Sequence, residues 1–378
     1  MNVRLSALIV CLNVAQLPIA MRPLTIALVA AEQAGGFSTA GLAGGAAATG
    51  MALSAPWWSR GLLRFGDRRV LIGSGTLFLA TELALAISHS PLPTIGAAAL
   101  SGLCTPPISS SVRSMLPRLT SSDDPSRAYA VNTVAVETVY IGSPLWVSGW
   151  VTLAGPAAAL VASALIGAVA LAAGIALAPA VPHRIHHAGP SLLAMPAVRT
   201  LGATYLAYWI CMGAMWVLLP AFATHAGAPQ QSGLLVALWS AGSLAGGLIL
   251  AARSTHGPQR DRYLWLLGML AATSLPLALP ATIATMAVAI TLFGVALAPW
   301  LATNDHLAAR VAGRRSGTLF GWLTTAGQIG SATGATLAGP LADRYGGGPA
   351  FLLVTIALGT GLVIALHRKE TLPRDSGA

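Results

Sequence analysis

The stretch "AEQAGGFSTAGL" at residues 31–42 is matched further along the chain by "ATHAGAPQQSGL" at residues 223–234. At nearly the same offset, 193 residues, Pro106 of "GLCTPP" falls on Pro299 of "GVALAPW", and "AGPAAALV" (154–161) falls on "GGPAFLLV" (347–354). Each match is weak, but they share one offset. The chain is therefore predicted to consist of two equivalent halves that follow one another in the same direction.

The composition is that of a membrane protein. Of the 378 residues, 55% are hydrophobic and 8% are charged, whereas soluble domains carry roughly 25% charged residues. Twelve apolar stretches each have about the 17–25 residues that a helix needs to cross the hydrocarbon core. They lie at roughly 5–31, 40–58, 70–88, 93–112, 129–152, 157–181, 200–222, 233–252, 263–280, 283–303, 317–340 and 349–367. We expect an all-α membrane protein of twelve transmembrane helices, in two six-helix bundles related as parallel repeats.

A polar segment separates the two halves. The stretch "VPHRIHHAGPSLLAMPAVR" (181–199) combines Pro, Gly and charge, a composition typical of linkers. We therefore predict an N-terminal six-helix bundle at 1–181, a cytoplasmic linker at 182–199, and a C-terminal six-helix bundle with a short cytoplasmic tail at 200–378.

The basic residues indicate the orientation. With both termini in the cytoplasm, all but two of the 21 Lys and Arg residues lie on the inner side, the exceptions being Arg22 within a span and Arg344 outside. The positive-inside rule thus favours a multi-pass protein of the plasma (inner) membrane with cytoplasmic termini. A basic face beside anionic lipid of the bilayer accounts for the net charge of +10, so no nucleic-acid partner is expected.

The loop between the second and third spans reads "SRGLLRFGDRRVLIG" (59–73). It is similar to the G-x-L-a-D-R-x-G-R-R signature of the Major Facilitator Superfamily in the same loop, and the resemblance covers essentially the whole chain. Leu63 stands where the signature has its acid. The resemblance implies a cytoplasmic gate, and the alternative is a charge cluster that only sets topology. The candidate gate residues are Arg64, Gly66, Asp67, Arg68 and Arg69.

The fifth span carries "IGSPLWVSG" (141–149), which resembles the G-x-x-x-G-P-x-x-G-G signature of the drug:proton antiporter branch. Pro144 removes one backbone hydrogen bond and kinks a helix, while Gly142 and Gly149 would allow a neighbouring helix to approach closely. The fourth-span R-x-x-x-G pattern of that branch is missing, because Ala98 stands where it has Arg.

Ionisable side chains within the spans are the candidates for function, because each costs several kcal/mol in hydrocarbon unless it is paired, hydrated or neutralised. Glu137 lies about 12 Å into its span, on a stripe with Thr133, Tyr140 and Ser148. We predict that Glu137 takes and releases a proton and that Arg22 is its electrostatic partner. The alternative is a buried ion pair that only sets helix register. Glu82 is predicted to interact with a nearby residue and to have a structural role.

The second half is aromatic where the first is charged. At the 193-residue offset Glu137 falls on Gly330 and Arg22 on Met215. The aromatic stripe of span seven is either packing or a substrate wall, and the resemblance favours the wall because spans one, four, seven and ten line the family's cavity. The predicted substrate-binding residues are Asn13, Gln16, Tyr140, Tyr205, Trp209, Trp216, Trp300 and Gln328.

We find no phosphate-binding loop, nucleotide signature or nucleophile motif, so neither an enzyme nor a cofactor is expected. His183, His186 and His187 have no acid or Cys nearby, so no metal site is predicted. The chain is interpreted as a secondary transporter that acts as a monomer on a small-molecule substrate and protons. Proton-coupled efflux of partly apolar molecules is favoured. The alternatives are a proton symporter that imports a nutrient, or a membrane receptor or enzyme on the same scaffold.

Overall fold

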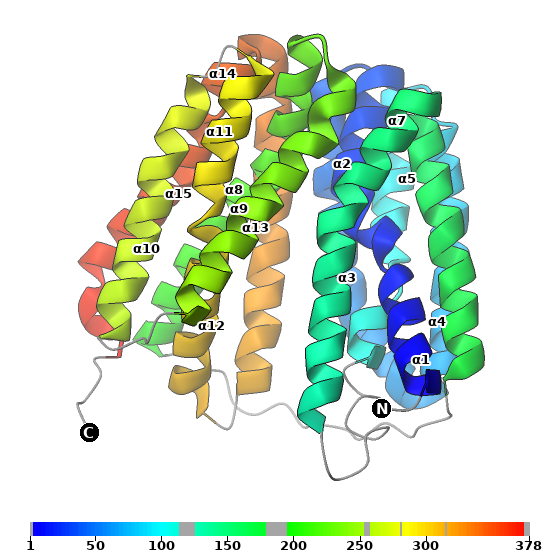
Figure 1. The fold of residues 1–378 in the computed structure, drawn as a ribbon, viewed down its shortest axis with the longest axis horizontal. Coiled ribbons are helices and arrows are strands. Elements are labelled where there is room, and N and C mark those ends of the chain that lie inside the picture. The colour runs from blue at the N-terminus through cyan, green and yellow to red at the C-terminus, as the bar shows by residue number, and fades with distance from the viewer. Residues whose placement is uncertain are drawn as a thin grey trace. The chain divides into compact units, whose positions relative to one another are not determined.

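The computed structural model describes residues 3–112, 125–178, 195–252, 258–279, 282–313 and 316–373. Every regular element in these ranges is a helix, which confirms the predicted all-α class. The chain divides into two compact units (Figure 1), which we call unit 1, Met1–His186, and unit 2, His187–Ala378.

Unit 1 consists of helices from the first half of the chain. Those whose bounds are described are α1 (Val3–Val14), α2 (Leu17–Gln33), α3 (Phe37–Phe65), α4 (Asp67–Ala86), α5 (Pro91–Leu103) and α7 (Pro125–Leu177), and residues 108–112 are also helical. The first predicted span is split between α1 and α2, with a turn at residues 15–16. Pro18 follows this turn in the first positions of α2, where its missing N–H costs nothing.

Unit 2 contains the helices of the second half. The α-helices are α8 (Pro196–His225), α9 (Ser232–Ala252), α10 (Gln259–Ser274), α11 (Ile283–Gly294), α12 (Leu297–Ala312), α13 (Ser316–Tyr345), α14 (Gly347–Ala350) and α15 (Leu352–His367). Among the residues that the structure describes, short 3-10 helices accompany them at η2 (Pro229–Gln231), η3 (Leu275–Ala278) and η5 (Lys369–Thr371).

Each of the twelve predicted spans contains helix in the described residues. Of these helices, 7 are long and apolar enough to cross a membrane by length and composition. Others, such as α3 and α13, fall below that hydropathy because Gly, Ser and Thr make up much of their sequences. Some of these small residues lie in close contacts between helices, as Gly50 of α3 and Gly330 of α13 do.

The internal repeat is visible in where helices break. In the fourth span α5 ends at Leu103 and helix resumes at residue 108, after Pro106 and Pro107. In the tenth span α11 ends at Gly294, α12 begins at Leu297, and Pro299 lies in the first turn of α12. Proline cannot donate a backbone hydrogen bond and favours such interruptions. Both halves therefore interrupt the same span, and at the 193-residue offset the two breaks lie within a few residues of each other.

Two glycines set sharp turns in unit 1. Gly66, with φ +78°, ends α3 and precedes α4, and Gly155, with φ +83°, divides α7 between the fifth and sixth predicted spans. Only glycine adopts such angles without steric cost. The division of α7 agrees with the two spans predicted from hydropathy.

Close backbone contacts hold helices together within each unit. In unit 1, a Cβ added at Gly102 of α5 would lie 2.0 Å from the carbonyl oxygen of Ala47 in α3. In unit 2, a Cβ at Gly334 of α13 would lie 1.9 Å from the carbonyl oxygen of Ile210 in α8. Lipid tails are as apolar as side chains, so helices in a membrane associate through close packing of this kind.

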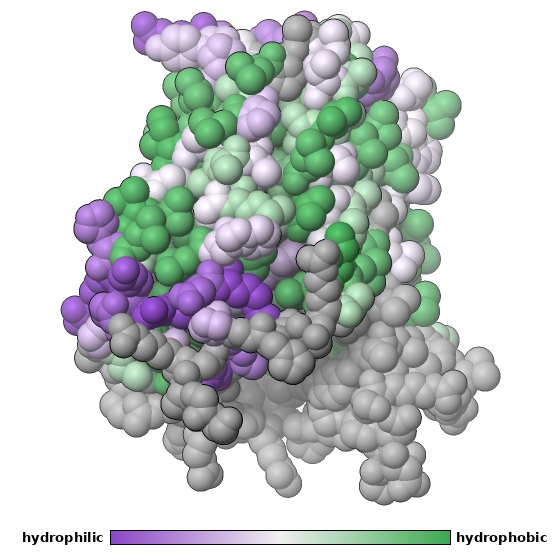
Figure 2. Space-filling model, turned by 60° about the vertical axis from the view of Figure 1, so that its left-hand side comes forward, coloured by the Kyte–Doolittle hydropathy of each residue, from purple (hydrophilic) through white to green (hydrophobic). Residues whose placement is uncertain are grey.

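The outer surface carries many exposed apolar side chains. In unit 2 these include Leu248, Trp265, Val288 and Ile356, each more than half exposed. Figure 2 shows hydrophobic residues spread over the middle of one face, with hydrophilic residues towards its ends. A surface of this kind suits contact with the hydrocarbon of a bilayer.

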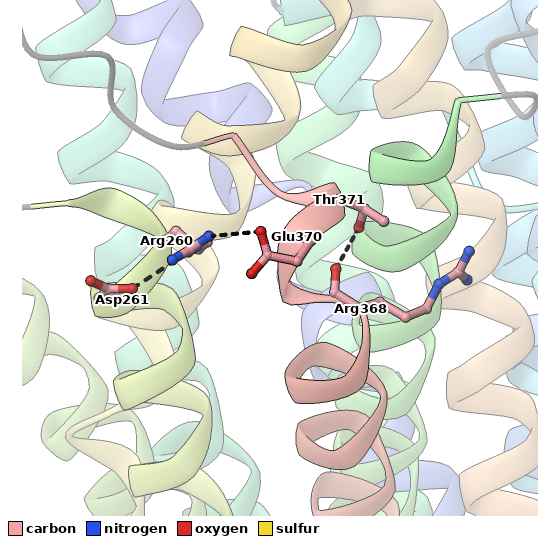
Figure 3. A network of polar contacts seen from close by, with 5 residues as sticks. All are labelled: Arg260, Asp261, Arg368, Glu370 and Thr371. Carbon is pink, nitrogen blue, oxygen red and sulfur yellow. Dashed lines mark hydrogen bonds and ion pairs between the residues drawn. The ribbon is translucent and has the colours of Figure 1, made fainter.

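Polar contacts join the beginning of α10 to the 3-10 helix η5 (Figure 3). Arg260 lies 3.5 Å from a carboxylate oxygen of Asp261 and 4.0 Å from one of Glu370. The hydroxyl of Thr371 donates to the carbonyl oxygen of Arg368 at 2.7 Å. These contacts tie the end of unit 2's last helix to its neighbour.

Candidate functional site

The side chain of Arg22 is buried inside unit 1, with only 4% of its surface exposed. From α2, its Nη1 donates to the hydroxyl of Thr105 at 2.5 Å and to the carbonyl oxygen of Ser101 at 3.4 Å. Its Nη2 contacts the sulfur of Met51 in α3 at 3.5 Å, and the guanidinium lies 6.0 Å from the centre of the Phe78 ring in α4. The cation is therefore held by residues from three neighbouring segments.

The break in the fourth span creates the acceptors for Arg22. Because α5 ends at Leu103, the carbonyl oxygen of Ser101 lies in the last turn of a helix, where carbonyls lack helical partners. Thr105 follows within the break, and its hydroxyl also donates to the carbonyl oxygen of Ser101 at 3.0 Å. A continuous helix would satisfy that carbonyl internally.

Glu82 of α4 belongs to the same network. Its side chain is completely buried, and its Oε1 accepts a hydrogen bond from the hydroxyl of Ser101. The positive charge of Arg22 also acts on this carboxyl group. The local partner predicted for Glu82 is thus Ser101, which contacts Arg22 through its backbone.

Asn13 and Gln16 form a second polar chain at the break between α1 and α2. Asn13 donates to the carbonyl oxygen of Ile9 at 2.8 Å, and Gln16 donates to Oδ1 of Asn13 at 3.0 Å. The hydroxyl of Ser109 donates to Oε1 of Gln16. The structure therefore brings both predicted residues together, and their role in substrate binding stays a prediction.

Glu137 and Tyr140 lie in the first part of α7, where the backbone is helical. Their side chains are outside the part of the chain that the structure describes. The predicted pairing of Glu137 with Arg22 therefore stays a prediction, as does the role of Tyr140.

Unit 2 contains an aromatic cluster centred on Trp300. This ring stacks on Tyr208 at 4.7 Å between centroids and lies 5.6 Å from Tyr263. The hydroxyl of Tyr263 shares a hydrogen bond of 2.5 Å with Thr204 and donates to Asn304 at 3.5 Å. Trp300 is completely buried. A substrate reaches its ring only if neighbouring side chains move.

The other predicted aromatics are partly exposed within unit 2. Tyr205 and Trp209 lie 6.1 Å apart on α8, and Trp216 meets Trp239 of α9 edge to face at 5.6 Å. Gln328 of α13 is also partly exposed. These side chains keep surface with which a ligand could make contact, unlike Trp300.

In the predicted gate segment, the acid and the arginines differ in burial. Gly66 makes the turn, and Asp67 follows as the first residue of α4 with 7% of its surface exposed. A carboxylate at this position stabilises the positive end of the helix dipole. Arg64, Arg68 and Arg69 are exposed. The turn and the buried acid account for the local fold, and a gating role stays a prediction.

The close approach predicted at Gly142 and Gly149 is absent among the described residues. A Cβ added at either position would meet nothing within 4 Å. Pro144 is buried, and only Gly155 has non-helical angles within α7. The tight contacts of α7 are made instead by Gly167 and Gly174, which face α2 and α1. Small residues in the sequence do not reveal which of them face a neighbour.

Sequence reasoning missed Thr105, Ser101, Ser109 and Met51 as partners of the polar residues. The signal available was the Thr-Pro-Pro stretch at 105–107, because prolines in a span predict a break with free backbone carbonyls. The histidines His183, His186 and His187 lie outside the described residues.

In unit 2, a carboxylate oxygen of Asp305 accepts a hydrogen bond from the side-chain amide of Asn304 at 3.4 Å.

Comparison with known proteins gives one family and several structural neighbours. A family model described as the Major Facilitator Superfamily matches residues 8–335. A variant of the nucleoside transporter NupG has a TM-score of 0.78 at 12% identity, with 98% of this chain and 100% of that chain covered. The human organic anion transporter MFSD10 (TETRAN) has a TM-score of 0.65 at 17% identity, with 96% and 100% covered. None of the curated protein sequences matches significantly. At these identities the neighbours show a shared fold.

Proposed function

The chain belongs to the Major Facilitator Superfamily and is thus a multi-pass membrane transporter of small molecules, and from this we propose a more specific function. We propose that it is a proton-coupled exporter of small, partly apolar molecules. Alternating access of a central site would carry the substrate across the bilayer. The antiporter-like stretch "IGSPLWVSG" (141–149) supports export over import.

The burial of Arg22 carries the proposal of proton coupling. Burial of a guanidinium with 4% exposure inside an apolar bundle costs free energy, and such residues are rare unless they serve a function. Thr105 and Ser101, which accept hydrogen bonds from Arg22, are neutral. A nearby carboxyl group that alternates between charged and neutral would therefore change the electrostatic balance of the guanidinium. We assign this alternation to Glu137. A proton from outside neutralises Glu137 and the substrate leaves, and loss of the proton to the inside resets the site.

The aromatic residues of unit 2 support a partly apolar substrate. Tyr205, Trp209 and Trp216 on α8 are partly exposed, and aromatic rings bind apolar groups or cations through their faces. Gln328 on α13 would add a polar contact. Trp300 would support this wall from behind, because it is completely buried.

The test is substrate flux in proteoliposomes under an imposed pH gradient, with the wild type and Glu137→Gln. We expect substrate to accumulate on the acidic side with wild type, and this accumulation to be lost with Glu137→Gln. The matched control is Glu32→Gln, which changes an exposed carboxyl near the end of α2 and should leave flux unchanged.

Three other results would contradict the proposal. Flux that ignores the pH gradient and is unaffected by Glu137→Gln would exclude proton coupling through this residue. Accumulation on the alkaline side would replace export by symport, with the same residues and the opposite direction of coupling. Binding or turnover of a ligand without flux would favour a receptor or an enzyme.

We further propose that the protein acts as a monomer in the plasma (inner) membrane with both termini cytoplasmic, and that residues 182–199 form a cytoplasmic linker. The excess of arginine in alternate connecting segments supports this orientation. Reporter fusions at each terminus, of a kind active on only one side of the membrane, test it. A terminus reported outside would overturn it.

A further inference from the structure

Glu82 is an incompletely satisfied carboxyl group in the interior of unit 1. Its side chain is 0% exposed. Ser101 donates to Oε1, while Oε2 has no hydrogen-bond partner among the described residues. A buried carboxylate normally collects several donors, because loss of water without compensation costs several kcal/mol. The second oxygen is therefore a position where a proton can bind.

The surroundings of Glu82 contain one described charge that acts on it, Arg22. Helix α4 packs against α3, α5 and α7. The sequence of α5 has no ionisable residue, and α7 has none from residue 142 to residue 177. In α3 the charged residues Arg60 and Arg64 are exposed near its end.

Other titratable groups of these segments are farther along the chain or not described at the side-chain level. Cys104, the residue after α5, is partly exposed. The side chains of Arg127 and Glu137 in the first part of α7 lie outside the described residues. The interaction of Glu82 with Arg22 is therefore argued from the hydrogen bonds that Ser101 makes with both residues.

Ser101 links the two charged groups directly. Its hydroxyl donates to Glu82, and its carbonyl oxygen accepts from Arg22 at 3.4 Å. Arg22 also lies over Phe78, which is one turn before Glu82 on α4 and shares its helix face. A change of charge on Glu82 thus acts on Arg22 both through space and through one residue.

We propose that Glu82 is a proton-binding site of unit 1, distinct from Glu137, and that its protonation weakens the hold of α4 and α5 on Arg22. The proton adds to Oε2 and turns the carboxylate into a neutral acid, with no other bond formed or broken. Loss of the negative charge removes an attraction on Arg22, which becomes freer to interact elsewhere. The link between this step and transport rests on the proposed function, whereas proton binding itself does not.

Infrared difference spectroscopy of the purified protein, acidic minus alkaline buffer, tests proton binding without transport. The wild type should show a carboxylic-acid C=O band that is lost in Glu82→Gln and kept in both Glu137→Gln and the exposed control Glu32→Gln. Ser101→Ala should move the pH at which this band appears, because the ionised form of Glu82 loses its donor. Ser101→Ala also serves if Glu82→Gln fails to fold.

A spectrum of folded Glu82→Gln that matches the wild type would overturn the proposal, and so would a band in Ser101→Ala that titrates unchanged. The flux assay separates this failure from that of the proposed function. If flux ignores the pH gradient but the Glu82 band is present, the proton site stands and proton-coupled transport falls. If both stand, Glu82→Gln should reduce pH-driven flux several-fold while Glu32→Gln does not.

Discussion

A Cβ on Gly330 of α13 would lie 2.7 Å from the carbonyl oxygen of Leu206 in α8. At the 193-residue offset, Gly330 is the position that matches Glu137. The contact of α13 with α8 leaves no room for any side chain there. An acid is therefore excluded from this position of unit 2 by packing, and the two halves of the repeat differ for a steric reason.

Substitution of Gly330 should destabilise unit 2. We expect Gly330→Ala to cost about 1–3 kcal/mol, because its methyl group forces α13 away from α8. Gly321→Ala is the matched control, since an added Cβ there meets nothing within 4 Å. Thermal unfolding in detergent should show a lower Tm for Gly330→Ala alone. Equal Tm values for the two variants would argue against this contact.

Removal of the Thr105 hydroxyl should weaken the site of Arg22. Thr105→Val keeps the shape but leaves the buried guanidinium without its 2.5 Å acceptor, which should cost about 1–3 kcal/mol. Thr152→Val is the control, because that threonine is exposed on α7. Thermal unfolding measures both, and the idea fails if Thr105→Val is as stable as wild type.

Trp300 is expected to act through packing, and Trp209 through substrate. Trp300→Phe should lower Tm, because it leaves a cavity beside Tyr208 that costs at least about 1 kcal/mol. Trp322→Phe, at a residue 46% exposed, should leave Tm unchanged. Trp209→Phe should raise KM for transport more than it lowers Tm. A raised KM with unchanged Tm in Trp300→Phe would assign that ring to the substrate.

The contact between Arg260 and Glu370 should contribute little to stability. The side chain of Glu370 is 62% exposed and lies 4.0 Å from Arg260, and exposed ion pairs contribute about 0–1 kcal/mol. Glu370→Gln should therefore change Tm little, and less still in high salt. Thr371→Val should have the larger effect, because Thr371 shares a 2.8 Å hydrogen bond with Thr200 of α8. The opposite order would show that the charge matters more.

Local sequence patterns were sufficient for the helices. In hydrocarbon every backbone group must be satisfied within its own segment, so an apolar stretch of the right length can only be a helix. The matching prolines Pro106 and Pro299 are also local signals, because each lies at or next to a break in the helix of its span. The resemblance of residues 59–73 to the family's loop signature was likewise readable along the chain, and the family is confirmed. The resemblance of residues 141–149 to the antiporter branch stays a prediction.

The predicted site residues show where such reading stops. Arg22 was recognised as exceptional from its position within a span. Its hydrogen-bond acceptors Thr105 and Ser101, however, lie 83 and 79 residues away along the chain. Periodicity gives the face on which a residue lies. It does not give the rotation of that face towards a particular neighbour.

The sequence by itself determined the twelve spans, their repeat and the family, because backbone satisfaction in a membrane depends on the composition of each segment alone. Only the tertiary structure decided which small residues form contacts, so that Gly102 and Gly330 are closed in while Gly142 and Gly149 face open space. It likewise decided that Glu82 meets Ser101 and, through it, Arg22. Such contacts depend on how helices dock against one another, and docking is set by the fit of whole surfaces distant in sequence.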